Sequence, residues 1–181
     1  MNPRWTLLPA AALVAPGAAF AVDYLTGDQA QAALFPEADR FEVKSFSLEE
    51  SERAAIQKRL NLQIRPKWVV RVAMHGGRVI GAAVVDDVIG KFDRITFAAG
   101  VGMDGVVRQV EILSYRESHG QEVRQESWRK EFAGKSETAK LMVGDDIGNI
   151  SGATLSTTHV ADGVRRIAAV ISSLKRSGAL K

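Results

Sequence analysis

The sequence predicts an α+β protein: an antiparallel β-meander sheet packed by helices, including a long C-terminal amphipathic helix. Two observations indicate this fold class. Paired β-branched runs, each pair joined by a turn with glycine, occupy the middle of the chain, and apolar residues recur at helical spacing near its end. The length of 181 residues, with 46% hydrophobic and 25% charged residues, fits one globular domain and excludes disordered, collagen-like and polytopic membrane proteins.

The overall charge and the cysteine content exclude several function classes. The net charge is only +3 and both signs are interspersed, so nothing favours binding to nucleic acid. The chain has no cysteine, which excludes disulfides, thiolate zinc sites, iron–sulfur clusters and a lipoprotein anchor. Three scattered histidines do not suggest a metal centre, and we expect none.

The first 21 residues have the pattern of a secretory signal peptide. They hold one charge, Arg4, then an apolar stretch, and end in Ala19-Phe20-Ala21, a small-x-small cleavage site. An uncleaved membrane anchor is the alternative, but two prolines interrupt a run that barely reaches the ~20 apolar residues needed to cross a bilayer. We therefore expect cleavage after Ala21 and an exported, periplasmic protein without a membrane anchor.

The segment that follows, residues 22–66, is expected to be helical. A Thr or Ser followed three residues later by Gln or Glu is a capping pattern, and it occurs at Thr26 and at Ser47. These patterns predict a short helix at 27–34 and a surface helix at 47–60.

Residues 67–181 are expected to form the main domain, which opens with two β-hairpins. Four runs are predicted strands: 68–74, 78–85, 92–101 and 106–115. The first pair flanks His75-Gly76-Gly77 and the second flanks Gly102-Met103-Asp104-Gly105, both of which are typical of tight reversals. Residues 121–132 and 136–142 are then predicted to be helical.

An amphipathic helix of about five turns is predicted near the C-terminus. Its apolar positions step by 4, 3, 4 and 3 residues, at Val160, Val164, Ile167, Ile171 and Leu174. Its charged face could bind a partner, but we favour a helix packed on the sheet with a solvated polar face.

Five hydroxyl side chains precede or begin this helix, between Ser151 and Thr158. Backbone amides at a helix N-terminus are unpaired and the helix dipole favours negative charge there, so a phosphate could bind. The alternative is that Ser156, Thr157 or Thr158 acts only as an N-cap. No Walker pattern is present, so a nucleotide triphosphatase is not indicated.

Within this segment, Ser151-Gly152-Ala153-Thr154 resembles the SGAT flavinylation motif of the FMN-binding domain family. That family includes the G subunit of the Rnf electron-transport complex and the C subunit of the sodium-pumping NADH:quinone reductase. Upstream, Glu117-Ser118-His119-Gly120 resembles the family's Glu-Thr-Pro-Gly segment, and 128–135 resembles its helix ending in an aromatic residue and Gly-Lys. The resemblance spans residues 68 to 174, so we take 67–181 as an FMN-binding domain.

The resemblance implies that Thr154 carries FMN covalently, as phosphothreonyl-FMN, through a phosphoester made by a periplasmic flavin transferase that uses FAD. Gly152 would then let the phosphate and the transferase approach the backbone closely. Ser151 would donate a hydrogen bond to a phosphate oxygen. Ala153 and Leu155 complete this part of the expected cofactor site. Ser156 and Thr157 are the alternative acceptor hydroxyls.

The resemblance also implies that Glu117, Ser118, His119 and Gly120 line the flavin site, although an ordinary glycine-containing turn is the alternative. His119 stands where the family often has proline, and we assign it no catalytic role. Phe132, Tyr115 and Leu155 could contact the isoalloxazine ring or could belong to the core. Gly148 departs from the family, which often has Asp three residues before the motif's Ser.

These observations predict a periplasmic electron-transfer flavoprotein that relays electrons between a membrane redox complex or cytochrome and an acceptor, because the cofactor supplies the redox chemistry. No catalytic acid–base pair stands out. Two alternatives stay open: a periplasmic binding or assembly module of the same fold without flavin, and a flavin reductase of a small acceptor.

Overall fold

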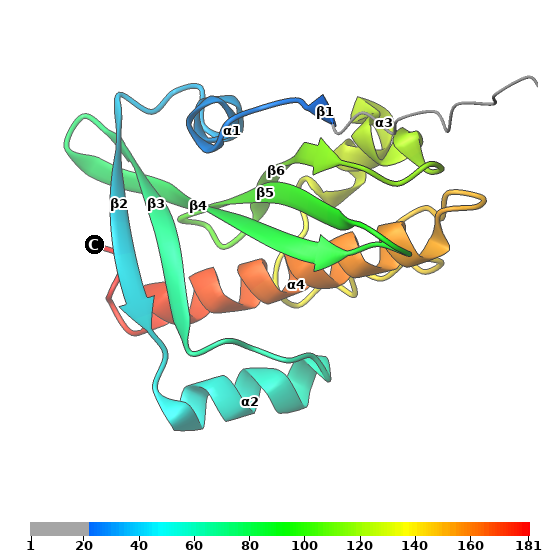
Figure 1. Cartoon of the computed structure of the whole chain (residues 1–181). Coiled ribbons are helices and arrows are strands. Elements are labelled where there is room, and N and C mark those ends of the chain that lie inside the picture. The colour runs from blue at the N-terminus through cyan, green and yellow to red at the C-terminus, as the bar shows by residue number, and fades with distance from the viewer. Residues whose placement is uncertain (1–21) are drawn as a thin grey trace, which may run out of the picture.

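A six-stranded antiparallel sheet forms the centre of the protein in the computed structural model, which describes residues 22–181 (Figure 1). The predicted signal peptide lies outside the described residues. The strands are β1 (Val22–Asp23), β2 (Arg40–Ser47), β3 (Lys67–His75), β4 (Arg78–Ile89), β5 (Arg94–Gly102) and β6 (Val107–Tyr115). Their order across the sheet is β1-β6-β5-β4-β3-β2.

Strands β3 to β6 form the predicted meander, each paired antiparallel with the next. Both predicted turns lie where the glycines indicated, after His75 and after Gly102. The α+β fold class is therefore confirmed.

Helices cover both faces of the sheet, as Figure 1 shows. They are α1 (Gly27–Leu34), α2 (Glu50–Leu60), α3 (Glu126–Arg129) and α4 (Thr154–Arg176), with 3₁₀ turns η1 (Gln121–Arg124) and η2 (Lys130–Phe132). Helix α4 packs on β4 and β5, and α2 packs beside α4. Helix α1 contacts β4, β5 and β6 and contributes to a second, smaller apolar cluster.

The long C-terminal helix is confirmed and buries the predicted apolar stripe. All five stripe residues are buried in the main core: Val160, Val164, Ile167, Ile171 and Leu174. This packing holds the axis of α4 along the sheet, and it therefore positions the N-terminal end of the helix in space.

The N-terminal segment 22–66 holds both predicted helices and also a strand that was not predicted. Helix α1 begins with the expected capping box, in which Thr26 and Gln29 bond each other's backbone amides. Strand β2 escaped prediction because Phe41 packs toward the smaller cluster and Phe46 toward the main core, so its apolar residues do not alternate on one face.

Several predicted elements differ from the structure. Ser47 does not cap α2: it ends β2, paired with Lys67, and the helix begins at Glu50 with Glu49 at its N-cap. Residues 136–142 are not helical. The Asp146 carboxylate instead accepts the backbone N–H groups of Leu141 and Met142, and this local pairing competes with a helix. Residues 121–132 form the short turns η1, α3 and η2.

Among residues 22–181, no helix is both long and apolar enough to cross a membrane.

Candidate functional site

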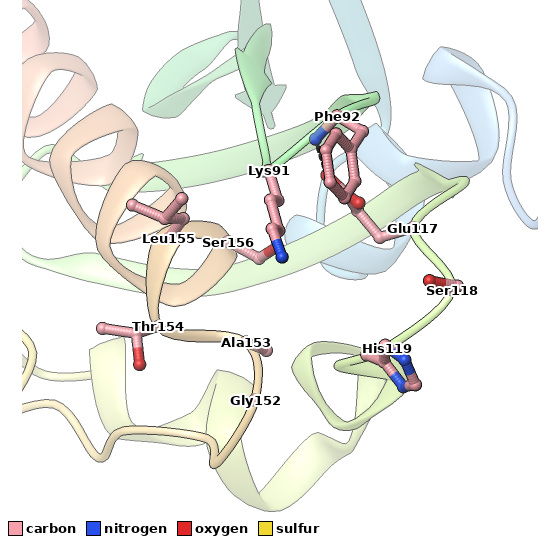
Figure 2. Close-up of a pocket in the computed structure, with 10 residues that line it drawn as sticks. All are labelled: Lys91, Phe92, Glu117, Ser118, His119, Gly152, Ala153, Thr154, Leu155 and Ser156. Atoms are coloured by element: carbon pink, nitrogen blue, oxygen red, sulfur yellow. Dashed lines mark hydrogen bonds between the residues drawn. The ribbon is translucent and has the colours of Figure 1, made fainter.

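A cavity of about 260 Å³ lies where three segments meet: the turn between β4 and β5, the chain that leaves β6, and the start of α4 (Figure 2). Its lining residues are Lys91, Phe92, Glu117, Ser118, His119, Gly152, Ala153, Thr154, Leu155 and Ser156. The two segments that the sequence singled out, 117–120 and 151–155, therefore come together although more than 30 positions separate them.

Thr154 is the first residue of α4, and it is exposed. Its Oγ1 accepts a hydrogen bond of 3.3 Å from Asn149 Nδ2. The N-cap position is held by Ala153, which has no polar side chain, so the amides of the first helical turn lack a side-chain acceptor. The start of the helix thus offers an exposed hydroxyl beside amides that favour an anion.

The hydroxyls that follow Thr154 do not cap the helix, contrary to the alternative left open for them. Thr157 is buried, and its Oγ1 donates back to the carbonyls of Ala153 and Thr154 over 3.2 and 3.0 Å. Ser156 is buried beside Tyr115. Thr154 is therefore the exposed hydroxyl at the cavity among these three.

The segment 117–120 is held against the start of α4 by close packing. Gly120 has a φ of +86°, and a Cβ added there would lie 2.2 Å from Ala153 Cβ and 2.6 Å from Tyr115 Oη. The buried Tyr115 hydroxyl donates to the His119 carbonyl at 2.6 Å and makes a second hydrogen bond of 3.3 Å with Ser156 Oγ. Burial raises the pKa of Tyr115, so this hydroxyl keeps its proton.

Glu117 binds the turn between β4 and β5 to the end of β6. Its buried carboxylate accepts the backbone amides of Phe92 at 2.7 Å and Asp93 at 3.1 Å. Burial opposes ionisation of this carboxyl, but the amide hydrogen bonds and the nearby Lys91 together lower its pKa. Glu117 is therefore an anion that positions one wall of the cavity.

Lys91 and Phe92 were missed by the sequence analysis, which placed Phe92 at the start of a strand. The strand begins at Arg94, and the two residues before Asp93 stand in the turn and line the cavity. The Phe92 side chain is 75% exposed, and the Lys91 ammonium lies 4.9 Å from the centre of its ring. The available signal was an aromatic residue in the short stretch between Gly90 and Asp93, where the sequence also favours a turn.

Seven of the nine predicted site residues line the cavity, and the other two, Ser151 and Gly120, lie next to lining residues. A Cβ added at Gly152 would meet nothing within 4 Å, and the φ of +78° at this position favours glycine. The close approach of Gly152 to the cofactor phosphate stays a prediction. Among the candidate ring contacts, Phe132 and Tyr115 are core residues, whereas Leu155 is 47% exposed and lines the cavity.

Gly148, where the family often has Asp, lies against a carboxylate. Its N–H donates to Glu131 Oε2 at 2.5 Å, and its carbonyl accepts from Trp128 Nε1 at 2.8 Å. A Cβ added at Gly148 would lie 3.1 Å from Glu131 Oε1. An aspartate here would place two carboxylates side by side, so glycine suits this chain.

The geometry defines a class: a small α+β domain with a cavity at a helix N-terminus that has no side-chain cap, lined by an exposed hydroxyl, a cation and exposed apolar side chains. The family model for the FMN-binding domain matches residues 90–169, a range that contains every lining residue of the cavity. This match confirms, over residues 90–169, the resemblance to the FMN-binding domain family that the sequence indicated. Among curated proteins, none matches the sequence.

The residues of the cavity fit FMN. The amides at the start of α4 suit a phosphate, the exposed Phe92 and Leu155 suit an aromatic ring, and Lys91 suits an anion. Figure 2 shows Lys91 and Phe92 on one side of the cavity, while Leu155 and the start of α4 form the other. A phosphate at the start of α4 therefore leaves room for an aromatic ring between the two walls.

Proposed function

We propose that this protein is a periplasmic electron-transfer flavoprotein that holds FMN through a phosphoester to Thr154. A flavin transferase outside the cytoplasm would attach the cofactor, with FAD as donor. The protein would then relay electrons between a membrane redox complex or cytochrome and an acceptor. The N-terminal sequence, with its signal-peptide pattern, supports export.

The observation that carries the proposal is the position of Thr154. Its hydroxyl is exposed at the cavity, at the start of a helix that has no side-chain cap, while Ser156 and Thr157 are buried. A transferase can reach Thr154 without unfolding the helix, and the phosphate it leaves would lie beside amides that need an acceptor.

The attachment step balances as a phosphoryl-group transfer. Thr154 Oγ1 forms a bond to the phosphorus of the FMN half of FAD, the bond within the pyrophosphate breaks, and AMP leaves. The hydroxyl proton passes to solvent or to the transferase. Thr154 thus becomes a phosphodiester with one negative charge, which the helix N-terminus stabilises.

Electron transfer is the favoured role because no acid–base pair stands out among the lining residues of the cavity. The one carboxylate there, Glu117, accepts two backbone amides at Oε1 and so has a structural task in the turn between β4 and β5. Bound FMN would supply the redox chemistry, and the chain would supply position and charge.

The decisive test is the intact mass of the mature chain after periplasmic co-expression with a flavin transferase. We expect the wild type to gain one FMN minus water, Thr154→Ser to retain a gain, and Thr154→Ala to show none. Thr158→Ala is the matched control, since it removes a neighbouring threonine hydroxyl that does not line the cavity, and it is expected to load fully. The Thr154→Ala chain should melt like the wild type because the residue is exposed.

A wild-type chain that stays unmodified, while the transferase loads a control domain, would contradict the proposal and favour a binding module without flavin. Fast steady-state turnover of the loaded protein with a small soluble acceptor would instead favour a flavin reductase. If the Thr154→Ala chain failed to fold, the exposure of Thr154 would no longer support it as the attachment site.

A further inference from the structure

We propose that the turn Gly90–Asp93 supplies the ring-binding wall of the cavity and that Lys91, within it, raises the reduction potential of the bound FMN. This inference rests on the proposed function, and it names the residues that tune the cofactor after it is attached.

The turn is built rigidly enough to present its side chains in a fixed place. The Gly90 amide donates to the Asp93 carbonyl at 2.8 Å, and the amides of Phe92 and Asp93 both bond the buried carboxylate of Glu117. A Cβ added at Gly90 would lie 2.3 Å from Glu117 Oε1, so the turn and the carboxylate are in direct contact. The turn is therefore held by the segment that follows β6 as well as by its own strands.

Phe92 leaves a large apolar surface uncovered at this cavity. Its side chain is 75% exposed, although a ring of this size normally gains free energy by burial. Leu155, 47% exposed, lines the same cavity from α4 (Figure 2). Apolar surface on two walls of one cavity suits a flat aromatic ring, and binding the ring would cover both side chains.

Lys91 adds a cation to this wall. Figure 2 shows its ammonium pointing into the space between the turn and the start of α4, and it stays 4.9 Å from the Phe92 ring centre. Reduction of the flavin ring by two electrons at neutral pH takes up one proton and leaves one negative charge. A cation at the ring stabilises this reduced form more than the neutral oxidised form, which raises the potential.

The test for Lys91 is the midpoint potential of the flavin-loaded chain, titrated with dithionite at low salt. Lys91→Gln is expected to lower the equilibrium constant for reduction about tenfold, which is about 30 mV for a two-electron couple. Lys91→Arg should restore the potential. Lys58→Gln is the matched control: it removes the same charge from the exposed surface of α2 and should leave the potential unchanged.

The test for Phe92 is the access of iodide to the flavin, read from fluorescence quenching. Phe92→Ala is expected to raise the quenching constant about twofold, while Ile89→Ala removes an exposed apolar side chain that does not line this cavity and should not change it. Neither substitution should shift the melting temperature of the flavin-free chain, because both side chains are exposed.

Intact mass is measured first on every variant, so the two proposals can fail separately. A wild type that carries no flavin overturns the proposed function and this inference with it. A loaded wild type whose potential falls equally in Lys91→Gln and Lys58→Gln overturns the role of Lys91 alone. Equal iodide access in the Phe92→Ala and wild-type proteins overturns the ring-binding wall.

Discussion

Glu117 shows how one side chain can shape the cavity without doing chemistry in it. The carboxylate is buried, and water that it gave up on folding is replaced by the amides of Phe92 and Asp93. These charge-assisted hydrogen bonds connect the end of β6 to a turn more than 20 residues earlier in the chain. The family resemblance named Glu117 as a site residue, and the contacts give it a positioning role.

Replacing Glu117 by glutamine tests this role. The Gln side chain keeps an oxygen acceptor but loses the charge, so we expect Glu117→Gln to lower the free energy of unfolding by about 1 kcal/mol at pH 7. Urea denaturation measures the change. Glu122→Gln, an exposed glutamate close by, is the control and should change stability by less than about 0.5 kcal/mol. Equal effects in both variants would contradict the role.

The same carboxylate predicts a dependence of stability on pH. Its pKa is lowered on folding, so its stabilisation is complete above the ordinary pKa of glutamate and is lost as the pH falls through the lowered value. The difference in stability between wild type and Glu117→Gln should therefore shrink from pH 7 toward pH 3. A difference that stays constant over this range would mean that the charge of Glu117 is not what holds the turn.

At the scale of elements, the cavity depends on one close contact between the 117–120 segment and α4. Gly120 and Ala153 approach so closely that no Cβ fits at Gly120, and Tyr115 fills the space below them. Small residues at both positions let the segment reach the helix N-terminus, and the two cavity walls are fixed relative to each other as a result.

Gly120→Ala should disrupt this contact. An alanine in the left-handed backbone conformation costs about 1 to 2 kcal/mol, and the clash of its Cβ costs about 1 to 3 kcal/mol. We therefore expect Gly120→Ala to lower the free energy of unfolding by about 2 to 5 kcal/mol. Gly134→Ala is the matched control: its φ is +80° but nothing lies within 4 Å of the added Cβ, so it should lose only the backbone share. Chemical denaturation compares them, and equal losses would show that the close approach is unimportant.

The elements also show what the sequence could predict. Helix α1, the meander and α4 were predictable because each is encoded locally, by a capping box, by glycine turns or by an apolar stripe. Strand β2 was not, because its apolar residues divide between two clusters that only the assembled sheet creates.

The site divides in the same way. The SGAT segment and the 117–120 segment were found because their residue types match a family pattern within a few positions. Lys91 and Phe92 match no such pattern: they reach the cavity because Glu117, a residue distant in sequence, accepts the amides of their turn. Contacts of this kind appear only once the strands are paired.

At the scale of the whole molecule, the N-terminal segment is built into the sheet that carries the cavity. Strand β2 pairs with β3 along its full length, and α1 covers the face opposite α4. At the end of α1, the ring of Phe35 is buried so closely on Gly81 and Gly100 that no Cβ fits at Gly81. We infer that residues 22–66 and 67–181 unfold as one unit.

Phe35→Ala tests this inference, since Phe35 lies in the N-terminal segment whereas Trp68 and Trp128, whose fluorescence reports unfolding, lie in the main domain. Removing a buried phenylalanine costs about 3 to 5 kcal/mol. In one cooperative unit, tryptophan fluorescence and far-UV circular dichroism should both shift to the same lower urea midpoint. Val43→Ala on β2, where the side chain is 63% exposed, should shift neither. If Phe35→Ala moves the circular dichroism transition but leaves the fluorescence transition in place, the two segments are separate folding units, and the cavity is held by residues 67–181 alone.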